Sequence, residues 1–187
     1  MAELDSIGLL ELSSVATGYL AQDAMLKAAP VELLLARTIC SGKYIVVVGG
    51  DVAAVTAAVD AGAAVSTGAL IERRVIPRVH PSVFPAISMA VDVPPDAASG
   101  ALGVIETFSA SSIVEVADAA AKTADVQLLR VHLAMALGGK GFVLLTGDVA
   151  SVEAAVAAGC EVAADEGILV GRAVIARPRR ELFRDYV

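Results

Sequence analysis

The chain has 187 residues, of which 57% are hydrophobic and 19% charged, with a formal net charge of −7. A mean hydropathy of +0.74 is high for a globular chain, so we expect an isolated copy to leave apolar surface exposed. Charged residues still interrupt every apolar stretch before the roughly 18 residues of a transmembrane helix, and no basic cluster is interleaved with aromatics, which argues against membrane and nucleic-acid partners.

The N-terminus and the two cysteines bear on the compartment of the protein. Residues 1–5 are acidic and lack the basic segment and apolar core of a secretory signal, which predicts a cytoplasmic protein. A reducing compartment makes a disulfide between Cys40 and Cys160 unexpected, so each cysteine needs its own explanation.

The first third of the chain predicts a strand, a helix and two further strands. The apolar run 7–12 has the length of a buried strand, and helix-forming residues follow from 17 to 29, where Pro30 ends the helix. The apolar runs 31–39 and 44–48 flank the loop Cys40-Ser41-Gly42-Lys43. They predict two strands joined by a tight connection.

A second helix and a last strand complete the first pattern. Asp51 is predicted to cap a helix whose Val52, Val55 and Val59 fall on one face. Residues 69–76 predict a strand. The order is βαββαβ, an α/β arrangement of the α+β, ferredoxin-like kind.

The second half of the chain repeats the first. The offset between matching residues grows from 95 to 97 and then to 99 positions, as expected when insertions fall in loops. We therefore predict two domains, residues 1–90 and 91–187, with a proline-rich linker over 79–99. Matching pairs include Gly8 and Gly103, Glu11 and Glu106, Asp23 and Asp118, Lys27 and Lys122, Gly42 and Gly139, Lys43 and Lys140, Asp51 and Asp148, and Arg78 and Arg177.

The motifs of both repeats resemble the bacterial microcompartment (BMC) shell domain. The resemblance implies two tandem BMC domains that form a pseudohexameric homotrimer. Such a trimer is a structural tile of the shell, not an enzyme, and other microcompartment shell proteins are its partners. The motifs are Ile7-Gly8-Leu9-Leu10-Glu11, Asp23-Ala24-Met25-Leu26-Lys27, Ser41-Gly42-Lys43, Gly50-Asp51-Val52-Ala53 and Ile76-Pro77-Arg78-Val79-His80.

The resemblance also assigns roles to individual residues. It implies a central pore lined by Cys40, Ser41, Gly42, Gly138 and Gly139. The residues implied to make contacts at the shell edge are Lys27, Lys122, Arg78 and Arg177.

Cys40 is the residue of greatest interest, because only the first of the two loops carries a cysteine. On a trimer axis, one cysteine per chain becomes three thiolates that face one point. The tandem shell proteins of the propanediol-utilisation branch, which this chain resembles, associate this position with an iron–sulfur cluster (4Fe-4S), one per trimer. That resemblance implies electron transfer across the shell, with enclosed redox enzymes as partners.

Several alternatives to the cluster stay open from the residues alone. Three thiolates and a water molecule also suit zinc, and a cysteine can be a small residue lining a pore without metal, through which metabolites pass. A ferredoxin-like small-molecule sensor or metal-dependent enzyme is the competitor from another class.

The remaining motifs have simpler interpretations. Cys160 follows Gly159 in a helix and is predicted to be a packed small residue, and His80 and His132 have no metal-ligand spacing. Gly49-Gly50-Asp51 predicts a tight turn and a helix cap, since no third glycine follows. No nucleophile, base and orienting group can be assembled, so we expect no enzyme.

Overall fold

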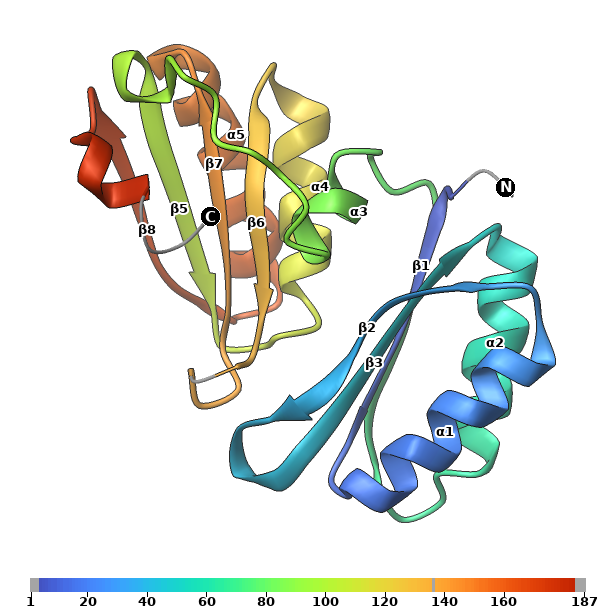
Figure 1. Cartoon of the computed structure of the whole chain (residues 1–187). Coiled ribbons are helices and arrows are strands. Elements are labelled where there is room, and N and C mark those ends of the chain that lie inside the picture. The colour runs from blue at the N-terminus through green and yellow to red at the C-terminus, as the bar shows by residue number, and fades with distance from the viewer. Residues whose placement is uncertain (1–3, 136, 184–187) are drawn as a thin grey trace. The chain divides into compact units, whose positions relative to one another are not determined.

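The structure, a computed structural model, describes residues 4–135 and 137–183 (Figure 1). By backbone contacts the chain forms two compact units, residues 1–81 and 82–187. Each unit contains one four-stranded sheet and one βαββαβ repeat, so the predicted fold class is confirmed. The predicted domain limits, 1–90 and 91–187, stay a prediction.

The first unit is an antiparallel sheet with two helices on one face. The strand order is β2-β3-β1-β4, and a 3-10 turn, Cys40–Gly42, joins β2 to β3. Its elements are β1 (Ser6–Leu12), α1 (Val15–Ala28), β2 (Glu32–Ile39), β3 (Lys43–Gly50), α2 (Val52–Ala64) and β4 (Leu70–Ile76).

The helix starts of the first unit follow from their capping residues. Ser14 Oγ accepts a hydrogen bond from Thr17 N, and Asp51 Oδ1 accepts one from Ala54 N at 2.8 Å. Val55 and Val59 are buried, whereas Val52 is 47% exposed. Val52 is the first residue of α2, where the helix has only begun to lie on the sheet.

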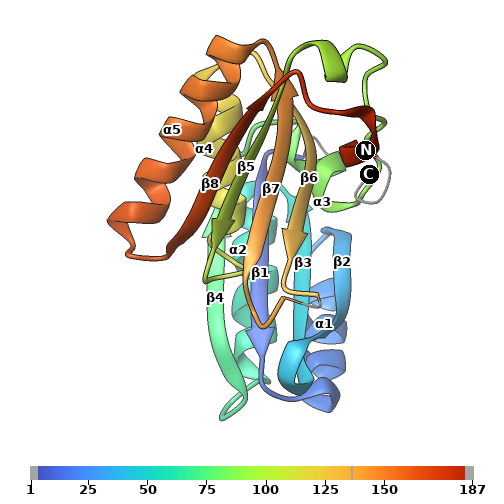
Figure 2. The ribbon, with the colours of Figure 1, turned by 90° about the vertical axis from the view of Figure 1, so that its left-hand side faces the viewer.

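The second unit repeats this arrangement, with the strand order β6-β7-β5-β8 (Figure 2). The structure places α3 and a 3-10 turn in the stretch that the sequence predicts as a linker, and α3 contacts β6 and α4. The elements are α3 (Val83–Ile87), η2 (Ala97–Ser99), β5 (Ala101–Thr107), α4 (Ile113–Thr123), β6 (Gln127–Leu133), β7 (Gly141–Gly147), α5 (Val149–Asp165), β8 (Leu169–Ala176) and η3 (Arg180–Phe183).

The core of each unit lies between the sheet and its helices. In the first unit α2 crosses β1 so closely that a Cβ at Gly8 would lie 2.6 Å from Val59 Cγ2. Gly103 has the same role under α5, where a Cβ would lie 2.9 Å from Val156 Cγ2. These two glycines allow the long helix of each repeat to approach the central strand. Over the residues described, the helices are too short or too polar for any of them to cross a membrane.

Candidate functional site

The loop that carries Cys40 is short and conformationally constrained. Ser41 and Gly42 both adopt the left-handed backbone region, with φ of 63° and 73°. A side chain rarely takes this conformation, at a cost of roughly 1–2 kcal/mol for a residue other than glycine. The Cys40 thiol is reduced and partly exposed, and a Cβ at Gly42 would meet no atom within 4 Å. The open space in this loop therefore lies at Gly42, two residues after the partly exposed Cys40.

An ion pair holds the base of this loop. Lys43 Nζ lies 2.8 Å from Glu11 Oε1, and the Glu11 side chain is only 8% exposed. The register explains the contact: Glu11 on β1 lies opposite Ile45 on β3, and Lys43 is two residues before Ile45 on the same face. The sequence marks Glu11 and Lys43 as repeat matches but does not predict that they pair.

The corresponding loop of the second repeat is longer and has no cysteine among its described residues. It runs from Leu133 to Gly141, and Ala134 N donates a hydrogen bond to Lys140 O at 3.1 Å to close it. Gly138 and Gly139 have φ of 64° and 92°, with open space around each. Residue 136 lies outside the described residues.

The same ion pair recurs at the base of the second loop, where it is more exposed to solvent. Lys140 Nζ lies 2.8 Å from Glu106 Oε1, but the two side chains are 36% and 33% exposed. The structure thus confirms the repeat at the level of side-chain geometry. Both loops are joined to the first strand of their own unit by a lysine–glutamate pair.

A histidine supports the second loop, a role that the sequence did not predict. His132 Nε2 lies 2.8 Å from Met135 O, and since a carbonyl only accepts, Nε2 is the donor. The His132 ring stacks on Phe142 with centroids 4.8 Å apart and planes 15° apart. His132 is only 6% exposed, so its side chain makes its contacts within the second unit.

One chain supplies a single thiol to the Cys40 loop. Among the described residues, no three side chains of His, Cys, Asp or Glu are grouped closely enough to hold a metal ion. The donor set at Cys40 therefore fits a metal or cluster only when several chains bring their loops together. Cys160, by contrast, is 5% exposed on α5, and burial raises the pKa of its thiol.

The residues predicted at the shell edge occupy matching exposed positions in the two repeats. Lys27 Nζ lies 2.6 Å from Asp23 Oδ2, and Lys122 pairs with Asp118 at the same distance. Arg78 and Arg177 follow the last strand of each repeat with φ of 53° and 49°. Both arginines are exposed.

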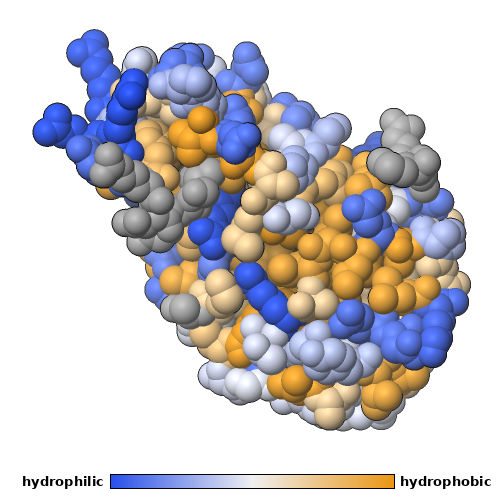
Figure 3. All heavy atoms as spheres, in the orientation of Figure 1, coloured by the Kyte–Doolittle hydropathy of each residue, from blue (hydrophilic) through white to orange (hydrophobic). Residues whose placement is uncertain are grey.

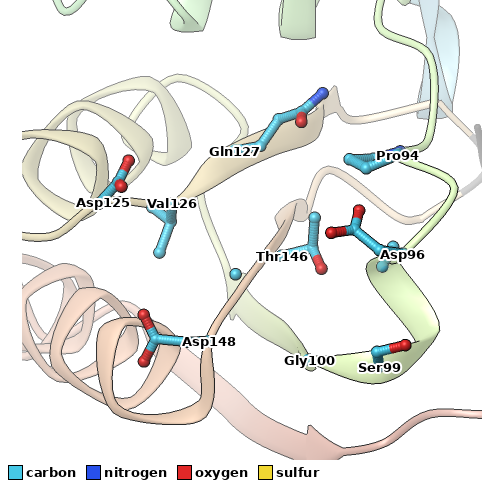
Figure 4. A pocket seen from close by; sticks show the side chains of 11 residues that line it. Pro94, Asp96, Ser99, Gly100, Asp125, Val126, Gln127, Thr146 and Asp148 are labelled. Atoms are coloured by element: carbon cyan, nitrogen blue, oxygen red, sulfur yellow. The ribbon is translucent and has the colours of Figure 1, made fainter.

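The second unit also has an open cavity of about 540 Å³, which lies apart from the predicted site residues (Figure 4). Asp96, Asp125 and Asp148 contribute carboxylates to its lining. Asp148 serves as the cap of α5, accepting hydrogen bonds from Ser151 N at 3.0 Å and Ser151 Oγ at 2.6 Å. These bonds lower the pKa of Asp148, so the role of this carboxylate is to cap the helix.

Comparison with known proteins agrees with this geometry. The BMC domain family matches the chain twice, over residues 6–79 and 101–178. The chain is 43% identical to the bacterial microcompartment shell protein PduT of Citrobacter freundii over 97% of both chains. It is 42% identical to the shell protein EutM of Salmonella typhimurium over 41% of this chain and 82% of that one.

A solved structure has the same fold. The crystal structure of a microcompartments protein from Desulfitobacterium hafniense DCB superposes with a TM-score of 0.92 at 49% identity, covering 97% of this chain and 99% of that one. The relatives named here are shell proteins, in agreement with the prediction that this chain is not an enzyme. The chain belongs to the family of bacterial microcompartment shell proteins, with two BMC domains in tandem.

Proposed function

We propose that three copies of the chain form a pseudohexameric ring, a tile of the microcompartment shell with a central pore. Cys40, Ser41, Gly42, Gly138 and Gly139 line this pore. The three Cys40 thiolates hold one iron–sulfur cluster of the 4Fe-4S type, through which electrons cross the shell.

One observation carries the proposal for the metal. Cys40 is a partly exposed thiol on a constrained three-residue turn, and Lys43, paired with the buried Glu11, fixes the base of that turn. Such a loop holds its thiol in one place, which a shared ligand needs. The second repeat has the same ion pair but Gly138 and Gly139 at its tip.

The donor count is consistent with a cluster at a threefold axis. Iron–sulfur clusters of this type take about four ligands. Three chains give three thiolates, so one iron takes a ligand other than cysteine. When bound, the cluster supplies one-electron transfer, and the chain's own contribution is to place three thiols at one point.

The partners follow from the position in a shell. Other shell proteins meet the tile at Lys27, Lys122, Arg78 and Arg177, all of which are exposed. A redox pore needs a source or acceptor of electrons inside the compartment, so enclosed redox enzymes are the second class of partner.

The test is anaerobic purification followed by iron and acid-labile sulfide analysis and by EPR after reduction. We expect about four iron and four sulfide per three chains in the wild type and none in Cys40→Ser. The matched control is Cys160→Ser, which removes a buried thiol and should keep the cluster. Iron in both Cys40→Ser and the wild type would place the metal elsewhere, and zinc in place of iron would change the identity of the metal.

A pore without metal is the second candidate, favoured by the open space around Gly42, Gly138 and Gly139. Backbone N–H groups at such glycines suit polar or anionic metabolites. Protein that stays free of metal after anaerobic reconstitution, with intact rings, would favour this candidate. A discrete dimer that never forms rings would instead favour a ferredoxin-like sensor.

A further inference from the structure

One packing contact between the first helix and the sheet is built in opposite ways in the two repeats. In the first repeat Gly18 of α1 lies against Tyr44 of β3, so closely that a Cβ at Gly18 would lie 2.6 Å from Tyr44 Cβ. In the second repeat Ile113 of α4 lies against Gly141 of β7, where a Cβ would lie 2.8 Å from Ile113 Cβ. The large side chain therefore comes from the sheet in the first repeat and from the helix in the second.

The four residues occupy equivalent positions. The helices α1 and α4 align at an offset of 95 residues, the spacing at which their lysine–aspartate ion pairs recur, and this offset takes Gly18 to Ile113. The strands β3 and β7 align through their registers with β1 and β5, which takes Tyr44 to Gly141. We call Gly18 and Tyr44 the first pair, and Ile113 and Gly141 the second pair. The second pair is the first with large and small exchanged.

Neither glycine is required by the backbone. Gly18 lies inside α1 and Gly141 begins β7, and neither is among the residues with positive φ. Glycine weakens a helix or a strand, because it loses the most conformational freedom on folding and has no side chain to pack. What each glycine provides is room for the large side chain opposite.

The polar end of Tyr44 also fits only its own helix. Tyr44 Oη donates a hydrogen bond to Gln22 Oε1 at 3.0 Å, and the Tyr44 ring lies 5.2 Å from that of Tyr19. At the offset of 95 residues, the equivalents of Gln22 and Tyr19 on α4 are Ala117 and Val114, which are both buried. The side chains of α4 at these positions therefore offer no acceptor for a tyrosine hydroxyl.

Exchanging the two helices would spoil both contacts. With α4 on the first sheet, Ile113 would meet Tyr44 in space that holds one large side chain. With α1 on the second sheet, Gly18 would face Gly141 and leave a void. Overpacking and cavities both destabilise a core, so each helix packs well only on the sheet of its own repeat.

Such an exchange is a hazard for a chain of this kind. The two sheets have the same strand order and matching registers, so the helix of one repeat finds a similar surface on the other sheet. The chain is also rich in apolar surface: Figure 3 shows a broad apolar area in the region where Figure 1 draws the first unit. Misassembly between domains and exchange of elements between copies are typical failures of repeat proteins.

We propose that the inverted pairs make each first helix recognise the sheet of its own repeat, and so prevent exchange of α1 and α4 within one chain or between two copies. A clash and a void disfavour the wrong partner while the right one is filled, which is how specificity between similar partners is achieved. This role concerns the folding of the chain and depends neither on the ring nor on a metal.

The test uses two variants that remove the difference between the repeats and keep each contact filled. Gly18→Ile/Tyr44→Gly gives the first repeat the second pair. Ile113→Gly/Gly141→Tyr, with Ala117→Gln to accept the hydroxyl, gives the second repeat the first pair. Because each variant reuses a pair that the chain already contains, we expect a native circular dichroism spectrum from both. Failure of both to fold would contradict the complementarity of the pairs.

Urea unfolding tests whether the residues act as a pair. Gly18→Ile alone should lower the unfolding midpoint through overpacking against Tyr44, and adding Tyr44→Gly should recover most of that loss. A double variant no more stable than Gly18→Ile alone would overturn the inference.

Refolding tests the discrimination between the repeats. The readout is the fraction of chains that return, after dilution from urea, to the molar mass of the same protein before unfolding, measured by size-exclusion chromatography with light scattering. Val59→Ala, which shortens a buried side chain of the first core and leaves both pairs intact, is the matched control for lost stability.

We expect the wild type and Val59→Ala to recover to similar extents. Each variant with identical pairs should recover a several-fold smaller fraction, with the rest in larger species that keep a native circular dichroism spectrum. Variants with identical pairs that recover as well as the wild type would overturn the inference. So would an equal loss in Val59→Ala, because stability alone would then explain the result.

Discussion

Glu11 and Lys43 form an ion pair of 2.8 Å at the base of the Cys40 loop, and its counterpart between Glu106 and Lys140 has the same length. The difference between the two pairs is burial. The Glu11 side chain is 8% exposed and that of Glu106 33% exposed. Because the two lysines are about equally exposed and only the glutamates differ, the two pairs can be compared within one chain for the cost of leaving a buried carboxylate without its cation.

Lys43→Met is expected to destabilise the first unit far more than Lys140→Met destabilises the second. Removing Lys43 leaves the buried carboxylate of Glu11 without its cation, which costs about 3 kcal/mol. Glu106 stays solvated when Lys140 is lost, at a cost below about 1 kcal/mol. Urea unfolding of both variants, with a probe in each unit, measures the difference. Equal losses would mean that the burial of Glu11 has no energetic consequence.

The two thiols are expected to react at very different rates with a disulfide reagent in metal-free protein. Cys40 is partly exposed, whereas Cys160 is buried and its raised pKa reduces the thiolate fraction that attacks. We expect one thiol per chain to react rapidly and the second only after unfolding or at higher pH. Cys40→Ser should abolish the fast phase, and Cys160→Ser should leave it unchanged. A fast phase that persists in Cys40→Ser would contradict the exposure of the loop.

Lys27→Ala combined with Arg78→Ala is expected to abolish extended sheets and leave the rings intact. Both side chains are exposed, and the Lys27–Asp23 pair on the surface contributes less than about 1 kcal/mol to stability. Electron microscopy of overexpressing cells, together with the molar mass of the purified protein, provides the readout. Arg73→Ala is the control, since Arg73 also forms an exposed ion pair, with Asp60. Sheets that survive the double change would show that the edge assignment is wrong.

The cap of α5 predicts a pH-dependent contribution to stability. Hydrogen bonds from Ser151 lower the pKa of Asp148 below its ordinary value of 3.8. The ionised carboxylate therefore stabilises the folded state above the unfolded pKa, and this stabilisation is lost as the pH falls through the lower folded pKa.

Asp148→Asn keeps a capping oxygen but removes the charge. The melting temperature of the wild type should exceed that of Asp148→Asn at neutral pH, and the gap should close as the pH falls below about 3.8. Thermal scans over a pH series measure it. A gap that does not change with pH would mean that the charge of Asp148 does not contribute.

Most of the fold could be predicted because each helix and strand of one repeat has a counterpart in the other, so each prediction could be made twice. The helix caps at Asp51 and Asp148 and the βαββαβ order depend on local or periodic sequence patterns, which can be recognised without knowing the tertiary contacts. The segment around α3 was missed because Pro81, Pro85, Pro94 and Pro95 suggest a linker. Pro85 lies inside α3 itself, near the helix start, where a proline needs no hydrogen-bonded N–H.

The candidate site was predicted less completely, because part of it depends on strand register. Glu11 and Lys43 are 32 residues apart, and only the alignment of β1 with β3 brings them together. A signal was present: both repeats place a glutamate in the first strand and a lysine at the start of the third. His132 gave no such signal, since Arg37 occupies the equivalent position in the first repeat, opposite Ile45 where His132 lies opposite Phe142.

The paired lysine and glutamate beneath each loop also bear on how such chains can change over time. Because the strands are joined below the loop, the residues between Ile39 and Lys43 can be exchanged or lengthened without moving the sheet. The second repeat, with several more residues between β6 and β7, is such a case. Two fused copies therefore allow one loop to acquire a new ligand while the other keeps its old role, which a chain with a single copy cannot do.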